Sequence, residues 1–166
     1  MERNSIVSHY LLSIDQMDAY INDLTNDEIK KIFEPMNCIG WLLGHCSFYN
    51  YSIANKINGE KIPDHAKNYM NGSPHSTPEL DQIKSIWFDS VSKVKISLNN
   101  LSNDDLKNKF TSEFKYKGTP EKINLGTDIS RLIFHLWNHL GEIASVRQLL
   151  GKNPGNPGYG RWDWRY

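Results

Sequence analysis

Apolar residues recur every three or four positions in four long segments of the chain. This spacing places them on one face of an α-helix. The four segments span about residues 5–24, 35–57, 78–98 and 127–151. Four amphipathic helices without a convincing strand predict an all-α fold, and we expect a four-helix bundle.

The ends of these helices carry recognisable signals. We place Pro35 and Pro78 at the first position of the second and third helices, because the missing proline N–H costs no hydrogen bond there. Thr25, followed three residues later by Glu28, predicts a capping box on a short extra helix. Gly151 is expected to end the last helix.

The connections on both sides of the third helix are long. Residues 58–76 are rich in Asn, Gly and Pro, and residues 100–126 form the second connection. Connections of this length allow a crossover topology as well as a simple up-and-down bundle. Residues 113–125, EFKYKGTPEKINL, alternate and could hold a short hairpin, but we predict a loop.

A single domain is expected to span residues 1–166 and to end in an aromatic tail. The segment 152–166 is rich in Gly and Pro and then strongly aromatic. Side chains as apolar as these are unfavourable in water, so we expect the tail to dock on the bundle or on a second subunit.

Charge argues against several classes of partner. Lys and Arg total 19, Asp and Glu also total 19, and the lysines are scattered. A net charge of zero without a basic patch predicts no binding to nucleic acid or to an anionic membrane. No apolar run approaches the ~20 residues of a membrane helix, and the start lacks the apolar stretch of a signal peptide. We therefore predict a cytoplasmic protein with no membrane partner.

The two cysteines suggest packing more than chemistry. Cys38 and Cys46 are too few and too poorly spaced for a disulfide framework or a redox motif. We expect both to pack as small apolar side chains, and we assign neither a nucleophilic role.

Histidines occupy core positions on two of the predicted helices. His135 and His139 lie ~40° apart around the helix and ~6 Å apart along it, so they share one face. That face is the apolar one, which continues through Leu132 and Ile143. His45 lies on the equivalent stripe of the second helix.

Two interpretations of these histidines stay open. Any one of them alone reads more simply as a core residue satisfied by a hydrogen bond. Three converging imidazoles can instead bind a divalent metal such as zinc, nickel or iron, and three protein ligands leave a position open for water or substrate. Leu136 replaces the glutamate of the HExxH motif, which argues against a zincin-type protease.

Four neighbouring residues are candidates for supporting roles. Trp41 and Tyr49 lie one turn before and after His45 and could wall a pocket, although core packing explains them equally well. Glu142 is the nearest acid to His139 and could orient a ligand or bind water, although such a glutamate is more often a solvated helix residue or an ion-pair partner. Gly141 is expected to permit close approach of another helix.

Two stretches resemble a known family. CIGWLLGHCSFYNYS and the downstream FHLWNHLGEIASVRQLLG are similar to the DinB/YfiT-like superfamily of four-helix-bundle metalloproteins. The most specific part is the H-x3-H-x-G-[QE] pattern at His135, His139, Gly141 and Glu142, followed by Arg147. This chain has glutamate at position 142, where the family usually has glutamine.

The resemblance implies more than the residues alone. It implies that His45, His135 and His139 form a metal triad, that the bundle is up-down-down-up, and that the protein is a homodimer. It also implies thiol-dependent S-transfer, in which a low-molecular-weight thiol attacks an electrophilic small molecule. The alternatives are a metal-dependent hydrolase of small molecules and a non-catalytic metal-binding stress or interaction protein.

Overall fold

Four long helices form the body of the protein, as the apolar pattern predicted. The computed structural model describes residues 4–99 and 101–153, so the aromatic tail from residue 154 onward lies outside the described residues and its docking stays a prediction. None of the helices in the described part is long and apolar enough to cross a membrane. The long helices are α1 (Ser5–Ile21), α3 (Ile39–Asn58), α4 (Leu80–Leu98) and α6 (Leu125–Leu149).

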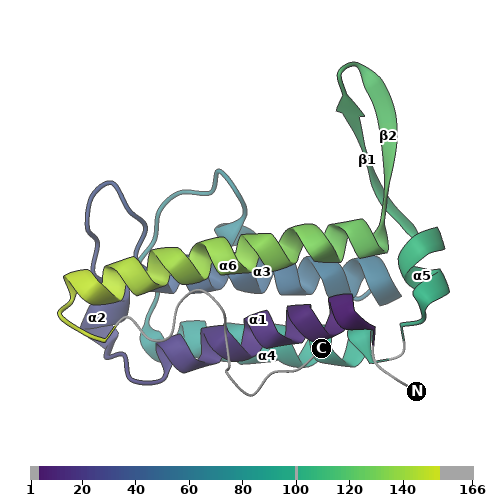
Figure 1. Ribbon diagram of the computed structural model, residues 1–166. Helices are drawn as coiled ribbons and strands as arrows, with labels where there is room; N and C mark the ends of the chain where they lie inside the picture. The colour runs from purple at the N-terminus through teal and green to yellow at the C-terminus, as the bar shows by residue number, and fades with distance from the viewer. Residues whose placement is uncertain (1–3, 100, 154–166) are drawn as a thin grey trace.

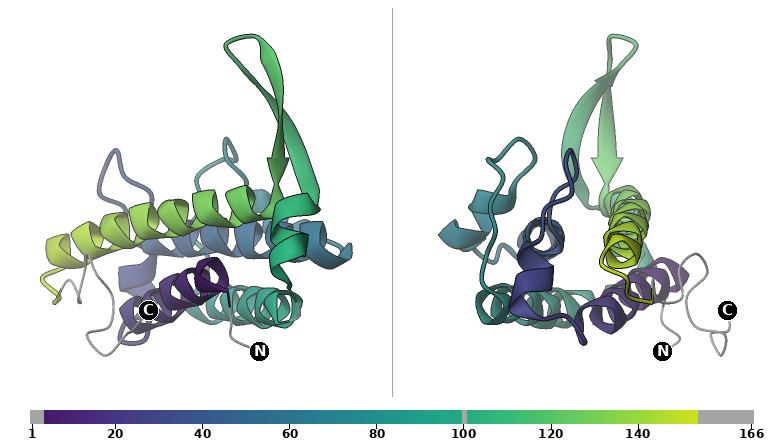
Figure 2. Two further views of the ribbon diagram at one scale, coloured as in Figure 1. Left: turned by 45° about the vertical axis from the view of Figure 1, so that its right-hand side comes forward. Right: turned by 90° about the vertical axis from the view of Figure 1, so that its left-hand side faces the viewer.

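The helices pack as two neighbouring pairs. Helix α3 packs against α4, α1 packs against α6, and α3 also contacts α6 along the side that carries the histidines (Figures 1 and 2). Helices α3 and α4 run in the same direction, because Asn50 bonds Ser90 near their middles and Asn58 bonds Ser97 near their ends. The apolar faces meet in one continuous core.

Short helices occupy the connections. Helix α2 (Asn26–Lys30) begins with the predicted capping box, in which Thr25 and Glu28 bond each other reciprocally. A 3₁₀ helix, η1 (Asp64–Tyr69), lies in the connection between α3 and α4, and α5 (Asn103–Asn108) follows α4.

The predicted helix starts at the two prolines are wrong. Helix α3 begins four residues after Pro35, at Ile39, because Cys38 is its N-cap and accepts a hydrogen bond from the Trp41 amide through Sγ. Helix α4 begins at Leu80, two residues after Pro78. Proline fits turns as well as first helical positions, so its presence does not fix the register of a start.

The predicted loop at residues 113–125 is also wrong, because it contains most of a β-hairpin. Strands β1 (Phe110–Tyr116) and β2 (Thr119–Asn124) pair antiparallel, and the hairpin projects away from the bundle (Figure 1). The connecting residues Lys117 and Gly118 both have positive φ, which is the geometry of a type I′ turn. Lysine is uncommon in that position, so the turn signal in the sequence was weak.

Helix α6 starts and stops with side-chain and backbone caps. The Asn124 side chain accepts from the Thr127 amide, so the helix begins slightly before the predicted start. At the other end Gly151 has a φ of 74°, and the amides of Gly151 and Lys152 bond the carbonyls of Gln148 and Arg147. These bonds form a Schellman motif, in which the residue after the helix adopts a left-handed conformation that glycine favours. The motif explains why Gly151 ends the helix, as predicted.

Candidate metal centre

Three histidines from α3 and α6 converge on one point, as the sequence predicted. The Nε2 atom of His135 lies 3.2 Å from Nε2 of His45 and 3.0 Å from Nε2 of His139. One ligand-type nitrogen from each of the three rings lies within 4.8 Å of the others. His45 and His139 are buried and His135 is half-buried, so the cluster lies between the helices with one side near the surface.

Protein acceptors fix the outer nitrogens of two of these rings. His45 Nδ1–H donates to the carbonyl oxygen of Tyr69 over 2.7 Å. His139 Nδ1–H donates to Oε2 of Glu142 over 2.5 Å. With the proton held on Nδ1, the neutral ring presents a lone pair on Nε2, which is the form that binds metal.

The donor set fits a divalent cation better than it fits a hydrogen-bond network. Nε2 of His45 and Nε2 of His139 are both acceptors, and a single proton on His135 Nε2 can satisfy only one of them. Two nitrogen ligands at the usual zinc distance and a tetrahedral angle lie ~3.3 Å apart. The distances from His135 Nε2 to the other two Nε2 atoms, 3.2 Å and 3.0 Å, are close to this value. The outer nitrogen of His135, Nδ1, is buried and has no hydrogen-bond partner among the described residues. A hydrogen-bond network within the protein therefore leaves this ring incompletely satisfied.

Burial keeps the rings of His45 and His135 in the neutral form that binds metal. Desolvation lowers the pKa of His45, and desolvation together with its two histidine neighbours lowers the pKa of His135 to about 4. Both rings are therefore neutral near pH 7, which removes the competition between proton and metal.

Trp41 and Tyr49 both contact the histidine rings. Trp41 stacks on His45 with ring centroids 4.9 Å apart, and its Nε1–H donates to the carbonyl of Pro74. Tyr49 packs edge-on against His135, with centroids 4.5 Å apart. These contacts limit rotation of the imidazoles and place both aromatic residues beside the cluster.

Glu142 is bound directly to a histidine of the cluster. Its hydrogen bond from His139 lowers the pKa of its carboxyl group, so the group is ionised at neutral pH. A carboxylate on the outer nitrogen of a histidine orients the ring and increases its basicity as a ligand. Of the roles considered for Glu142 from the sequence, this hydrogen bond favours orientation of His139.

The residues that hold His45 were not found from the sequence. Tyr69 contributes only its backbone carbonyl, at the end of η1, and a backbone acceptor has no signature in the sequence. Gly44 lets the Tyr69 ring lie directly on α3, because a Cβ at this position would overlap that ring. Gly141, by contrast, has nothing within 4 Å of its Cβ position among the described residues, so the expected close helix approach there is wrong.

The two cysteines are structural. Cys38 caps α3, and its thiol donates to the carbonyl of Ser76. Cys46 is fully buried, and burial raises the pKa of its thiol. A buried neutral thiol is inert, as the sequence predicted.

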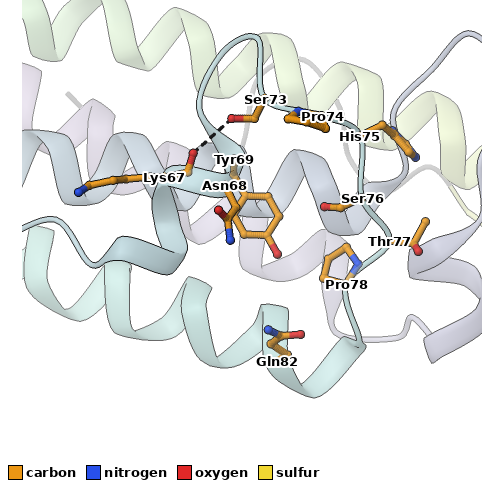
Figure 3. A pocket seen from close by; sticks show the side chains of 10 residues that line it. All are labelled: Lys67, Asn68, Tyr69, Ser73, Pro74, His75, Ser76, Thr77, Pro78 and Gln82. Atoms are coloured by element: carbon orange, nitrogen blue, oxygen red, sulfur yellow. Dashed lines mark hydrogen bonds between the residues drawn. The ribbon is translucent and has the colours of Figure 1, made fainter.

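One hollow borders the cluster, and a second lies near the Tyr69 side of it. The first, of about 300 Å³, opens beside His135 between α3 and α6, and its lining includes Tyr49, Lys56, Asp128 and Arg131. The other, of about 460 Å³, lies around the loop after η1, where the Tyr69 ring is part of the lining (Figure 3). The first hollow shares a candidate ligand with the cluster and is the natural approach to it.

Comparisons with known proteins agree with this architecture. A solved structure of a DinB-like protein from Bacillus cereus ATCC 10987 superposes with a TM-score of 0.65 at 17% identity, covering 93% of this chain and 95% of the other. At that identity the likeness shows the fold alone. No curated protein matches the chain significantly. The family model of the DinB superfamily matches residues 9–143, which includes all three histidines, so the chain belongs to the DinB superfamily.

Proposed function

We propose that this protein is a metal-dependent enzyme that activates a small thiol at the three-histidine site for transfer to an electrophilic small molecule. The observation that carries the proposal is the convergence of three Nε2 atoms, two of them fixed as acceptors by Tyr69 and Glu142. Zinc or nickel, and also iron, suit three imidazole ligands.

Such a cation would supply Lewis acidity that lowers the pKa of a thiol at its open position. The protein itself fixes the positions and orientations of the three imidazole rings before any ligand binds. Tyr69 and Glu142 set the tautomers, and Trp41 and Tyr49 restrict the ring planes. Preorganisation of this kind spares the site a reorganisation cost when ligand binds.

The surroundings favour a thiol over an activated water. Hydrolysis benefits from a free carboxylate as general base. Glu142 is bound to His139, and Asp128 is bound by Lys56 and Thr111. Both carboxylates therefore already have one oxygen engaged by donors of the protein, which makes each a weaker general base than a free carboxylate. A thiol, whose pKa is already lower than that of water, needs less help.

The test is conjugation of 2-mercaptoethanol to 1-chloro-2,4-dinitrobenzene, followed by absorbance. We expect the metal-loaded protein to accelerate the reaction, and chelator treatment or His45→Ala to abolish the acceleration. His65→Ala, which changes an exposed histidine on η1 outside the cluster, should keep it. An equal rate with and without metal would refute thiol activation.

The remaining expectations belong to the same proposal. The parallel course of α3 and α4 supports an up-down-down-up bundle, which would place α3 beside α6. A homodimer and a cytoplasmic location remain predictions from the sequence. Light scattering at several protein concentrations measures the first of them.

A further inference from the structure

The hollow beside His135 lies along the same two helices as the cluster. Its volume is about 300 Å³, at the lower end of the range for small-molecule sites. Arg131 lines it one helical turn before His135. A ligand in this hollow would therefore have one end beside the histidines and the other beside Arg131.

The charges that line the hollow do not cancel. Lys56 bonds Asp128 over 2.6 Å, and Thr111 also donates to that carboxylate, so this pair is neutral and satisfied. Arg131 is exposed and has no carboxylate partner among the described residues. The guanidinium of Arg131, with five N–H donors, therefore has an unbalanced positive charge, and it lies next to a site that would itself carry a cation.

We propose that this hollow binds the carboxylate of a small-molecule ligand, with Arg131 as the residue that recognises it. The inference rests on the proposed function for the placement of the ligand's other end, a thiol, at the histidine cluster. A planar guanidinium matches a carboxylate through two parallel N–H···O bonds. Ser52 and Tyr49 also line the hollow, and their hydroxyl groups are uncharged hydrogen-bond donors.

Three thiols of similar length and different charge test the proposal. They are 3-mercaptopropionate, 2-mercaptoethanol and cysteamine, titrated into the cobalt-substituted protein while the thiolate-to-cobalt charge-transfer absorption is followed. The variants are Arg131→Gln and, as matched control, Lys31→Gln, which removes the same charge from an exposed residue outside the hollow. The three thiols differ in pKa, but this difference is the same for every protein variant. Comparing the ratio of affinities between variants therefore removes its effect.

We expect the wild type and Lys31→Gln to bind 3-mercaptopropionate about tenfold more tightly than 2-mercaptoethanol, as a charge-assisted hydrogen bond allows. Cysteamine should bind most weakly. Arg131→Gln should lose most of the preference for the anion while binding 2-mercaptoethanol as before. An unchanged preference in Arg131→Gln would overturn the proposal.

A second probe separates the failure of this proposal from the failure of thiol activation. Propionate carries the carboxylate without the thiol, and propionamide is its neutral match. In the protein as purified, propionate should shift the Arg131 Nε–H signal in a saturable way, and propionamide should not. If no thiol produces the cobalt absorption but propionate gives this shift, the result supports the carboxylate site and refutes thiol activation. Equal or absent responses to both probes would overturn the carboxylate site.

Discussion

Helix α6 contributes to two polar centres, one at His135 and His139 and one at Arg147, and they are completed in different ways. Near its C-terminal end Arg147 is only 4% exposed. Its guanidinium donates to both carboxylate oxygens of Asp23 and to the carbonyls of Tyr20 and Asn153. The protein itself satisfies this charge on every side.

The histidine centre lacks that completeness. The outer nitrogens of His45 and His139 have protein partners, but the three inner nitrogens face one another. A buried polar group that serves stability is satisfied by the fold, as Arg147 is. A group whose lone pairs meet at one point lacks such partners within the fold, and this contrast within one helix supports the proposal that the histidines bind a cation.

Removing Arg147 should give the largest effect on stability. We expect Arg147→Ala to lower the free energy of unfolding by about 2 to 3 kcal/mol, because a buried ion pair with several carbonyl bonds is broken while the half-exposed Asp23 stays hydrated. Urea denaturation measures the change. Arg131→Ala, an exposed arginine on the same helix, should change it by less than about 0.5 kcal/mol.

Metal content should be unaffected in Arg147→Ala as long as the protein is folded. If this variant lost metal at a temperature where it remains folded, the two centres would be coupled, and the proposed division of roles along α6 would be wrong.

Gly44→Ala should affect both stability and the histidine centre. The added methyl overlaps the Tyr69 ring and pushes away the carbonyl that holds His45, so we expect a loss of about 1 to 3 kcal/mol and weaker metal binding. Gly141→Ala is the control, because its methyl meets nothing among the described residues and should add up to about 1 kcal/mol of helix stability. Equal metal affinity in both variants would contradict the role of Tyr69.

Acidification should destabilise the metal-free protein in a defined window. The folded pKa of His135 is about 4, below its ordinary value of 6.5, so the unfolded chain binds the proton more readily. The contribution of His135 to the free energy of unfolding should therefore be complete above pH 6.5, decrease as the pH drops toward 4, and be absent below it. His135→Leu should flatten this profile, and an identical slope in that variant would contradict the assignment.

Glu142→Gln should have the smallest effect. The amide still accepts from His139 Nδ1–H, but it lacks the charge that increases ring basicity, so we expect metal affinity to fall by up to about tenfold with no loss of stability. Competition with a chromogenic chelator measures the affinity. Glu121→Gln, on the exposed strand β2, should leave it unchanged, and tighter binding in Glu142→Gln would refute the contribution of the carboxylate charge to ligand basicity.

The sequence was most informative where side chains repeat at helical spacing. His135 and His139 were found because they occupy leucine positions, and His45 because it lies on the matching stripe of α3. The apolar pattern predicted the four long helices for the same reason. Periodicity reports which face of a helix is buried, and burial is what brings the three imidazoles together.

Features set by the backbone could not be predicted in this way. The acceptor for His45 is the carbonyl of Tyr69, which any residue could provide. Gly44 was uninformative in the sequence because only the packed structure shows what its Cβ would meet. The hairpin turn at Lys117 and Gly118 depends on two positive φ angles, of which only the glycine gave a signal.

The central claim is that the three histidines hold a metal ion, and metal per chain measures it directly. The protein would be purified without a metal-binding tag, supplied separately with zinc, nickel and iron, and analysed for elements after gel filtration. We predict about one equivalent of at least one of these metals in the wild type and in His65→Ala, and almost none in folded His139→Ala. No stoichiometric metal in the wild type, or equal metal in His139→Ala, would contradict the claim.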